Sequence, residues 1–321
     1  MRAIHHTRYG APHVLALGEA PRPSPRDDEV LVAVHASAVT HGDRRLRAAD
    51  FPGIGWLPGR LMTGLFRPRR LVPGTTFAGR VVEVGAAVTR FAKGDEVFGL
   101  RTHGAYAEYL VMPEGGAIAP RPARLDHAEA AALPYGGTTA LTFLRDLGKV
   151  QPGERVVVVG ASGGVGRFAV QLARHLGADV TAVCSRDQDL MTELGAHHVI
   201  DYTREDFLAS GRRYDVVFDT SETNQFARCR GSLAPTGRYL TVHLSLQSLA
   251  QMGTTSMFGG PRSLCGVSVA TRENLDEVCK LVETGALRSV VASRFPLERT
   301  ADAHACLEAG RTRGGVVVEV V

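Results

Sequence analysis

Between Arg155 and Val269, short β-branched runs alternate with segments of helical periodicity, and this alternation limits the fold more than any other feature of the chain. Residues 165–176 carry apolar side chains at helical spacing and are followed by Gly177, a typical helix C-cap residue. Alternating strands and helices predict a parallel sheet covered on both faces. The six expected strands start at Arg155, Asp179, His197, Tyr214, Arg238 and Leu264.

The rest of the chain has a different pattern. Strand-like runs start at Glu29, Phe77 and Gly104 and are separated by Gly and Pro turns. After Val269 we expect helices over about 273–283 and 300–309 and a final strand within residues 314–321. This pattern predicts a mostly β domain to which the end of the chain returns.

A glycine-rich segment, GASGGVG at residues 160–166, follows the first strand of the alternating region and opens its helix. In this context small residues let the backbone turn tightly and approach a pyrophosphate at the helix N-terminus. The three positions of the G-x-G-x-x-G pattern are Ala161, Gly163 and Gly166, so alanine replaces the first glycine. We predict a dinucleotide site, with an ordinary glycine-rich turn as the alternative. The predicted binding residues are Ala161, Ser162, Gly163, Gly164, Val165 and Gly166.

The end of the second strand bears on the choice of nicotinamide cofactor. A carboxylate there accepts from a ribose 2′-hydroxyl, whereas arginine and hydroxyl groups suit a 2′-phosphate. The strand is followed by Ser185 and Arg186, with no acid before Asp187. The sequence therefore favours NADPH (NADP), bound through Ser185 and Arg186, and the alternative is that Arg186 only faces solvent.

Composition excludes several classes of protein. The chain has 37 Lys and Arg against 33 Asp and Glu, a net charge of +4 that is too small to predict a nucleic-acid partner. The five cysteines include no C-x-x-C pair, and no stretch is apolar enough to predict a secretion signal or a membrane span. We therefore expect a cytoplasmic protein with reduced thiols and no membrane partner.

Several longer segments identify a family resemblance. They include PGTTFAGRVVEVG from Pro73, GAYAEYLVMP from Gly104 and LAPTGRYLTV from Leu233. With these segments in this order, the sequence resembles the medium-chain dehydrogenase/reductases, and among them the zinc-free, zeta-crystallin-like quinone oxidoreductases. The resemblance implies an α/β fold, with a GroES-like β domain over residues 1–122 and 270–321. It also implies a Rossmann domain over 123–269 with a doubly wound parallel six-stranded sheet, and a homodimer paired through the strand over residues 264–269.

The resemblance also implies further cofactor contacts. Thr139, His243 and the segment from Val267 to Val269 match positions near the nicotinamide, and Tyr202 matches a position near the 2′-phosphate. The alternatives are a helix cap for Thr139 and a packing role for Tyr202. Asp189 stands where some members have a lysine, which leaves Arg186 as the main candidate for the positive charge.

The zinc-binding relatives use a Cys, a His and a Glu at three positions that are Thr40, Thr75 and Thr76 here. Neutral hydroxyls do not replace a thiolate and an imidazole as zinc ligands, so we expect no metal. Without a Lewis acid, reduction of a simple ketone loses its main electrostatic support, whereas a quinone or enone spreads the incoming charge.

These observations favour an NADPH-dependent reductase of quinones or α,β-unsaturated carbonyl compounds. Thr40 is expected to hydrogen-bond the substrate carbonyl and His41 to donate a proton or hydrogen bond, with packing as the alternative for His41. The alternative functions are a reductase of carrier-bound or coenzyme-A-bound enoyl thioesters, and a non-catalytic NADPH-binding sensor or structural protein.

The segment from Arg44 to Leu71 mixes arginines with large apolar residues. We expect it to form a substrate wall, with Phe51, Trp56 and Phe66 lining the substrate together with Tyr135. One alternative is a docking site for an acidic carrier protein. The other is an amphipathic helix with a solvated arginine face.

Overall fold

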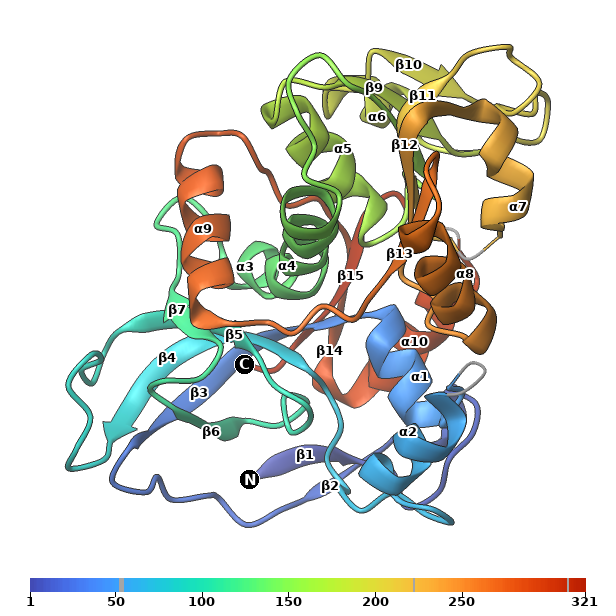
Figure 1. The fold of residues 1–321 in the computed structure, drawn as a ribbon. Coiled ribbons are helices and arrows are strands. Elements are labelled where there is room, and N and C mark those ends of the chain that lie inside the picture. The colour runs from blue at the N-terminus through green and yellow to red at the C-terminus, as the bar shows by residue number, and fades with distance from the viewer. Residues whose placement is uncertain (52–54, 222, 311) are drawn as a thin grey trace. The chain divides into compact units, whose positions relative to one another are not determined.

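The computed structural model describes residues 1–51, 55–221, 223–310 and 312–321, and the contacts of the chain divide it into two units (Figure 1). Unit 1 contains residues 1–51, 56–135 and 270–321, and unit 2 contains Gly55 and residues 136–269. The division after Val269 coincides with the one expected from the sequence. The other division differs, because residues 123–135 pack with unit 1, where helix α3 (His127–Ala131) contacts the sheet.

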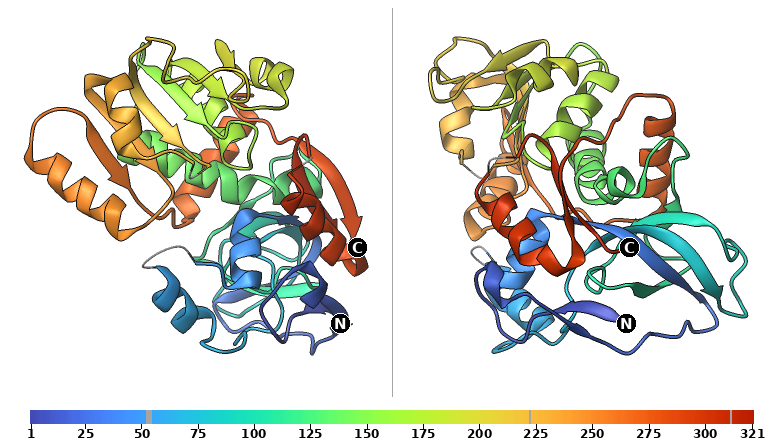
Figure 2. Two further views of the ribbon diagram at one scale, coloured as in Figure 1. Left: turned by 90° about the vertical axis from the view of Figure 1, so that its right-hand side faces the viewer. Right: turned by 180° about the vertical axis from the view of Figure 1, so that it is seen from behind.

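The strands of unit 1 form a seven-stranded sheet and a separate two-stranded sheet. They are β1 (Arg2–His5), β2 (Ala16–Glu19), β3 (Glu29–Val39), β4 (Thr76–Val84), β5 (Glu96–Leu100), β6 (Tyr109–Pro113), β7 (Ile118–Pro120), β14 (Val291–Pro296) and β15 (Gly315–Glu319). The long sheet has the order β14-β15-β3-β4-β5-β7, and β6 also pairs with β3. Both chain ends lie in unit 1, and β15 runs antiparallel beside β3 (Figure 2). The predicted return of the chain end to the β domain is confirmed.

Unit 1 contains the helices α1 (His41–Ala48), α2 (Trp56–Thr63), α3, α9 (Arg272–Glu283) and α10 (Thr300–Glu308), with short turns η1 (Pro12–Val14) and η5 (Leu297–Arg299). Of these helices, α3, α9 and α10 pack on strands of the sheet, and α1 and α2 carry segments discussed below. Helices α9 and α10 confirm the two predicted from periodicity. The run from Gly104 is a strand only from Tyr109, because Gly104 has φ +93° and its amide donates to the Pro73 carbonyl in a turn.

Unit 2 holds a parallel six-stranded sheet with the order β10-β9-β8-β11-β12-β13. Its strands are β8 (Arg155–Val159), β9 (Asp179–Val183), β10 (His198–Ile200), β11 (Tyr214–Asp219), β12 (Leu233–Thr241) and β13 (Arg262–Cys265). Its helices are α5 (Gly166–His175), α6 (Gln188–Glu193), α7 (Phe226–Cys229) and α8 (Leu246–Met257), with η3 (Thr142–Leu147) and η4 (Arg230–Ser232); α4 (Leu133–Leu141) enters it from unit 1. This order is that of a Rossmann sheet, which confirms the predicted α/β class.

Three of the six predicted strands begin at other residues. The strand expected from His197 begins one residue later, at His198, and the other two differ more. The strand expected from Arg238 begins at Leu233, ahead of an irregularity in its pairing with β11. The strand expected from Leu264 ends at Cys265, so residues 266–269 lie outside it. A hydrogen bond of 3.1 Å between the Ser268 and Thr142 hydroxyls holds these residues against η3 instead.

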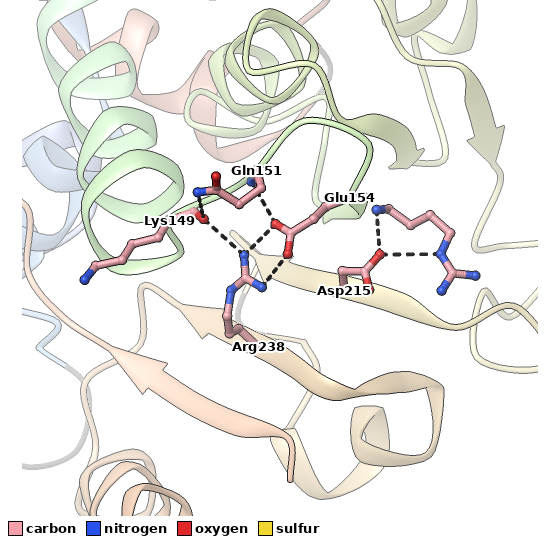
Figure 3. A network of polar contacts seen from close by, with 6 residues as sticks. Lys149, Gln151, Glu154, Asp215 and Arg238 are labelled. Atoms are coloured by element: carbon pink, nitrogen blue, oxygen red, sulfur yellow. Dashed lines mark hydrogen bonds and ion pairs between the residues drawn. The ribbon is translucent and has the colours of Figure 1, made fainter.

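A charged network joins residues at the amino ends of β8 and β11 to Arg238, which lies within β12 beside the start of β11 (Figure 3). Arg238 donates to both carboxylate oxygens of Glu154, at 2.7 and 2.6 Å. Asp215 accepts from the Arg155 amide at 2.8 Å. Because this network lies at the amino ends, the carboxyl ends of the same strands are left for ligand binding, as is usual in open parallel sheets.

No helix among the described residues is long and apolar enough to cross a membrane.

Candidate functional site

The glycine-rich turn folds as a tight loop between β8 and α5. The Gly160 and Ala161 amides both donate to the Val183 carbonyl at 3.1 Å, and the Gly163 amide donates to the Gly160 carbonyl at 2.9 Å. A Cβ on Gly166 would lie 2.2 Å from the Gly160 carbonyl oxygen, so only glycine fits there. A Cβ on Gly164 would meet nothing within 4 Å, so the backbone there borders open space. The turn therefore fits a ligand that approaches the N-terminus of α5 closely.

The turn lies beside the carboxyl end of β11, where the strand order of the sheet reverses. The Thr220 amide donates to the Val159 carbonyl at 3.0 Å, and its hydroxyl donates to the same oxygen at 2.8 Å. A Cβ on Gly160 would lie only 2.8 Å from the Thr220 hydroxyl oxygen. The turn thus lies at the reversal of strand order, where open parallel sheets usually bind their ligands.

A pocket of about 520 Å³ lies at the carboxyl ends of β11 and β12. It is lined by Asn224, Gln225, Phe226, Tyr239, Thr241, His243, Ser245, Leu246, Gln247, Ser248 and Gln251. Its volume lies in the range of small-molecule sites, and its lining is mainly polar with Phe226, Tyr239 and Leu246 as the large apolar or aromatic residues. Of the residues predicted to contact nicotinamide, His243 is in this lining.

Buried Asp219 organises the wall of this pocket. One carboxylate oxygen accepts from the Ser221 amide at 3.0 Å and hydroxyl at 2.8 Å, and the other accepts from the Asn224 amide at 2.8 Å. The Tyr239 hydroxyl lies 3.1 Å from the same carboxylate. Burial raises the pKa of Tyr239, and the charge of Asp219 raises it further, so Tyr239 keeps its proton and serves as a fixed donor.

The sequence analysis missed Asp219 and Tyr239. The signal for Asp219 was present, since an acid that ends a central strand of a parallel sheet lies at the ligand edge. Tyr239 is brought to it only by the lateral pairing of β11 with β12.

Arg167, which was not predicted from the sequence either, contacts the backbone of the turn. Its guanidinium donates to the Ser162 carbonyl at 2.7 Å, and the side chain is buried. Burial lowers the pKa of Arg167 to about 10, while the charge of Asp187 raises it. Arg167 therefore stays charged near neutral pH and holds the turn in shape.

The residues predicted near the 2′-phosphate are partly brought together. The Ser185 hydroxyl donates to the Tyr202 hydroxyl at 3.0 Å, and the Tyr202 side chain is 60% exposed. Arg186 is exposed between Ser185 and Asp187, and Asp187 has a left-handed φ of +58° ahead of α6. Two hydroxyls and an arginine therefore face solvent at the end of β9. Tyr202 does not pack in a core.

The other predicted nicotinamide contacts lie on two segments of unit 2. Thr139 is half-buried in α4 and is not its N-cap, since α4 begins at Leu133. Val267 and Val269 are 67% and 69% exposed, after the end of β13.

In unit 1, Thr40 caps helix α1. The Asp43 amide donates to the Thr40 hydroxyl oxygen at 3.1 Å, and Asp43 Oδ2 accepts from the Thr40 amide at 2.9 Å and from its hydroxyl at 2.6 Å. Burial raises the pKa of Asp43 to about 6, although hydrogen bonds from Thr40 and Thr75 lower it. Thr40 is thus committed to the helix cap, and its hydroxyl proton already has an acceptor.

A buried polar chain lies near Asp43. Arg47, which is 2% exposed, donates to His304 Nδ1 at 2.9 Å and pairs with Glu308. Because arginine can only donate, Nδ1 accepts, so Nε2 carries the proton and donates to the Tyr106 hydroxyl 3.2 Å away. Burial first, and then the charge of Arg47, lowers the pKa of His304 to about 3. His304 is therefore neutral near neutral pH.

The remaining predicted substrate contacts in unit 1 differ in exposure. His41 is exposed at the start of α1, and a Cβ on the neighbouring Gly42 would lie 2.9 Å from Tyr135 and 3.3 Å from the Thr40 hydroxyl oxygen. Tyr135 therefore lies close to Thr40. The ring of Phe51 packs on Gly59 of α2, whereas Trp56 and Phe66 are 50% and 88% exposed.

The three threonines at the zinc-ligand positions do not fit a zinc ion. Thr40 and Thr76 hold the backbone, since the Thr76 hydroxyl accepts from the Ala38 amide at 3.0 Å, and Thr75 offers only a neutral hydroxyl. In the part of the chain that the structure describes, no group of three or more His, Cys, Asp or Glu side chains could hold a metal ion.

Comparison with known proteins gives two family matches. Residues 26–123 match the alcohol dehydrogenase GroES-like domain, and residues 194–318 match the family described as zinc-binding dehydrogenase. The first match agrees with the GroES-like domain expected in unit 1.

Individual relatives match over the full chain. The chloroplast envelope quinone oxidoreductase homolog of Arabidopsis thaliana is 31% identical, covering 99% of this chain and 98% of the relative. The structure of the quinone oxidoreductase from Coxiella burnetii is 30% identical with a TM-score of 0.87, covering 100% of this chain and 99% of its own. The Escherichia coli quinone oxidoreductase complexed with NADPH is 25% identical with a TM-score of 0.82, covering 100% of both chains.

Proposed function

The chain belongs to the medium-chain dehydrogenase/reductase superfamily, with quinone oxidoreductases among its relatives, and we propose that it is an NADPH-dependent, zinc-independent reductase of quinones or enones. The observation that supports NADPH binding is the shape of the turn at residues 160–166. Gly164 borders open space, where a ligand could approach, and Gly166 packs against the Gly160 carbonyl oxygen. The bound nicotinamide would supply the electron pair as hydride.

Residues of unit 2 would hold the cofactor. The turn and the N-terminus of α5 suit the pyrophosphate, with Arg167 keeping the turn in place. Ser185, Arg186 and Tyr202 suit the 2′-phosphate, since two hydroxyls and a guanidinium supply donors and no carboxylate lies directly after β9. Thr139, His243, Val267 and Val269 would border the nicotinamide.

Residues of unit 1 would act on the substrate. His41, exposed at the start of α1, is the candidate donor to the substrate oxygen, while Tyr135 would position the ring. Thr40 can donate to that oxygen only when Asp43 no longer accepts its proton. With neutral hydroxyls at the zinc positions, acceptors that delocalise the incoming charge are favoured over simple ketones.

The edge of the unit 2 sheet suggests a second copy as partner. Strand β13 ends the strand order, and Phe258 beside it is 71% exposed. We propose a homodimer paired along this edge, because an edge strand can add a strand from another chain. The Ser263 amide of β13 already donates to the Thr255 hydroxyl of α8 at 3.1 Å, so the second copy would pair with the other backbone groups of this edge.

The proposed activity is tested with purified protein of measured metal content. NADPH absorbance should fall after addition of a benzoquinone or a cyclic enone, and should stay constant with the corresponding saturated ketone. NADPH binding without turnover across this panel would favour the sensor alternative, and turnover only with an enoyl thioester would favour the thioester reductase. Loss of activity on chelation, restored by zinc, would contradict the zinc-independent mechanism.

A further inference from the structure

A segment of unit 1 exposes far more apolar surface than its neighbours. Helix α2 and the chain after it expose seven large apolar side chains to 40% or more. These are Trp56, Leu57, Leu61, Met62, Leu65, Phe66 and Leu71. We refer to this surface as the 56–71 face. Isolated exposed apolar residues are ordinary, but seven within one short segment form the kind of patch that marks an interaction surface.

The packing of α2 explains why its apolar side chains point outward. Gly59 and Thr63, four residues apart, face inward, where Gly59 packs on Phe51 and Thr63 lies 3.1 Å from the Tyr9 hydroxyl. Leu57 and Leu61 lie on the opposite face and are 53% and 52% exposed. In α2 the small and polar residues face the rest of unit 1 and the apolar residues face solvent. An ordinary surface helix has its apolar residues on the inner side.

Backbone hydrogen bonds hold the chain after α2 in a defined shape. The Gly64 amide donates to the Arg60 carbonyl at 2.7 Å, and the Arg69 amide donates to the Thr63 carbonyl at 2.8 Å. Gly64 has φ +124°, and a Cβ there would lie 2.0 Å from the Arg67 carbonyl oxygen, so the turn requires glycine. Leu65 and Phe66 therefore project from an ordered turn rather than from a loose tail.

The segment that forms the 56–71 face is also positively charged, and it contains no acidic residue. Residues 56–71 contain Arg60, Arg67, Arg69 and Arg70 and no Asp or Glu. Arg67, Arg69 and Arg70 are exposed, while the Arg60 guanidinium lies 4.6 Å from the centre of the Tyr9 ring. A partner must therefore be anionic and must also accept protruding apolar side chains.

We propose that the 56–71 face binds the surface of a membrane that contains anionic lipids. Aromatic and leucine side chains would enter the boundary between headgroups and acyl chains while the arginines contact lipid phosphates, as interfacial helices do. An acidic, polar carrier protein would match the arginines but leave the apolar side chains in water. A two-fold contact between copies would bring like-charged arginines together. Surface binding needs no segment that spans the bilayer, so it differs from the expectation of no membrane partner, which rested on the lack of an apolar span.

The inference goes beyond the proposed function and is tested without NADPH or substrate. The full chain is sedimented with vesicles of phosphatidylcholine alone, and with vesicles that also contain phosphatidylglycerol. We expect binding to the anionic vesicles at least about tenfold stronger than to the neutral ones, decreasing as salt is added, because several arginines contribute.

Matched variants locate the binding surface. Arg69→Gln should weaken binding to anionic vesicles by about fivefold, in line with the loss of one basic residue. Phe66→Ser should weaken it by about tenfold or more, in line with the loss of one buried aromatic side chain. Val84→Ser and Lys93→Gln, which change exposed residues elsewhere in unit 1, should leave it unchanged, and circular dichroism confirms that all four variants fold. No binding to anionic vesicles, or equal binding by all variants, would overturn the proposal. Self-association that Phe66→Ser abolishes, or binding to an acidic carrier protein in place of vesicles, would also overturn it.

Discussion

Thr40 and Asp43 exchange hydrogen bonds in both directions: the Asp43 amide donates to the Thr40 hydroxyl, and that hydroxyl donates to the Asp43 carboxylate at 2.6 Å. The pair begins helix α1 and places His41 at its first position. The pair also determines when Thr40 can donate a hydrogen bond to a substrate. The Thr40 hydroxyl has one proton, and it donates that proton to Asp43 while the Asp43 carboxylate is charged.

Asp43→Asn should change how stability depends on pH. Burial raises the pKa of Asp43 to about 6 from an ordinary 3.8, so the folded protein keeps this proton where the unfolded chain has lost it. The contribution of Asp43 to the free energy of unfolding is therefore largest below about pH 4. It falls as the pH rises from about 4 to about 6, and it no longer changes at higher pH. Asparagine keeps the cap acceptor and does not titrate. The free energy of unfolding of the wild type, minus that of the variant, should fall on the order of 3 kcal/mol between about pH 4 and 7, at about 1.4 kcal/mol per pKa unit.

The difference between wild type and variant is used because His304 makes the free energy of unfolding depend on pH in the opposite direction. Burial lowers the pKa of His304 to about 3, so its contribution to stability is lost as the pH falls below the ordinary imidazole pKa of 6.5. This contribution is present in both proteins and cancels in the difference. Denaturant unfolding at a series of pH values measures it, and a difference independent of pH would contradict a buried, protonatable Asp43.

His41→Gln should lower kcat with a quinone or enone by about 100-fold, the usual contribution of a positioned proton donor. The dissociation constant for NADPH should not change, because the proposed cofactor contacts lie in unit 2. Steady-state kinetics with fluorescence titration of NADPH separates the two effects. His13→Gln, another histidine of unit 1, is the control. Unchanged kcat in His41→Gln would assign His41 to packing.

Arg186→Ala should weaken NADPH binding about 10- to 100-fold, the loss expected for one charge-assisted hydrogen bond. NADH binding should change by less than about twofold, since NADH lacks the 2′-phosphate. Titration of the wild type and the variant with both cofactors measures this, and Arg212→Ala removes an exposed arginine of the same unit as a control. Equal loss for the two cofactors would rule out a 2′-phosphate contact at Arg186.

Two glycines of the turn should respond differently to alanine. Gly166→Ala should destabilise the protein by about 1 to 3 kcal/mol, because its Cβ would lie 2.2 Å from the Gly160 carbonyl oxygen. Gly164→Ala should change stability by less than about 0.5 kcal/mol, yet weaken NADPH binding, because its Cβ would occupy the open space above the turn. Unfolding curves and cofactor titration distinguish them. Full NADPH affinity in Gly164→Ala would place the pyrophosphate elsewhere.

Local patterns predicted most of the fold. The six-stranded sheet follows from β-branched runs at regular spacing, and the turn at residues 160–166 follows from its position between a strand and a helix. The capping pair also had a signal, since threonine three residues before aspartate forms a capping box, but the sequence suggested for Thr40 a substrate contact and a lost zinc ligand rather than a cap.

Contacts between distant parts of the chain could not be predicted. Arg47 and His304 are separated by 257 residues, and no local pattern links them. The strand expected from Leu264 was placed too late for a similar reason, because contacts with η3 rather than β propensity decide where β13 ends. The outward apolar face of α2 also depends on Tyr9, which lies 54 residues before Thr63 and contacts it only in the fold.

The central claim, 1,4-reduction by NADPH without a metal, is tested most directly by following deuterium. Metal-free protein is incubated with a cyclic enone and NADPH that carries two deuterium atoms at the reactive carbon of the nicotinamide, so that either face delivers deuterium, and the product is analysed by mass spectrometry and NMR. We expect a saturated ketone with one deuterium at the β-carbon. Deuterium at the carbonyl carbon of an alcohol product would indicate the chemistry of a zinc alcohol dehydrogenase, and a product without deuterium would show that no hydride is transferred; either result would contradict the proposed function.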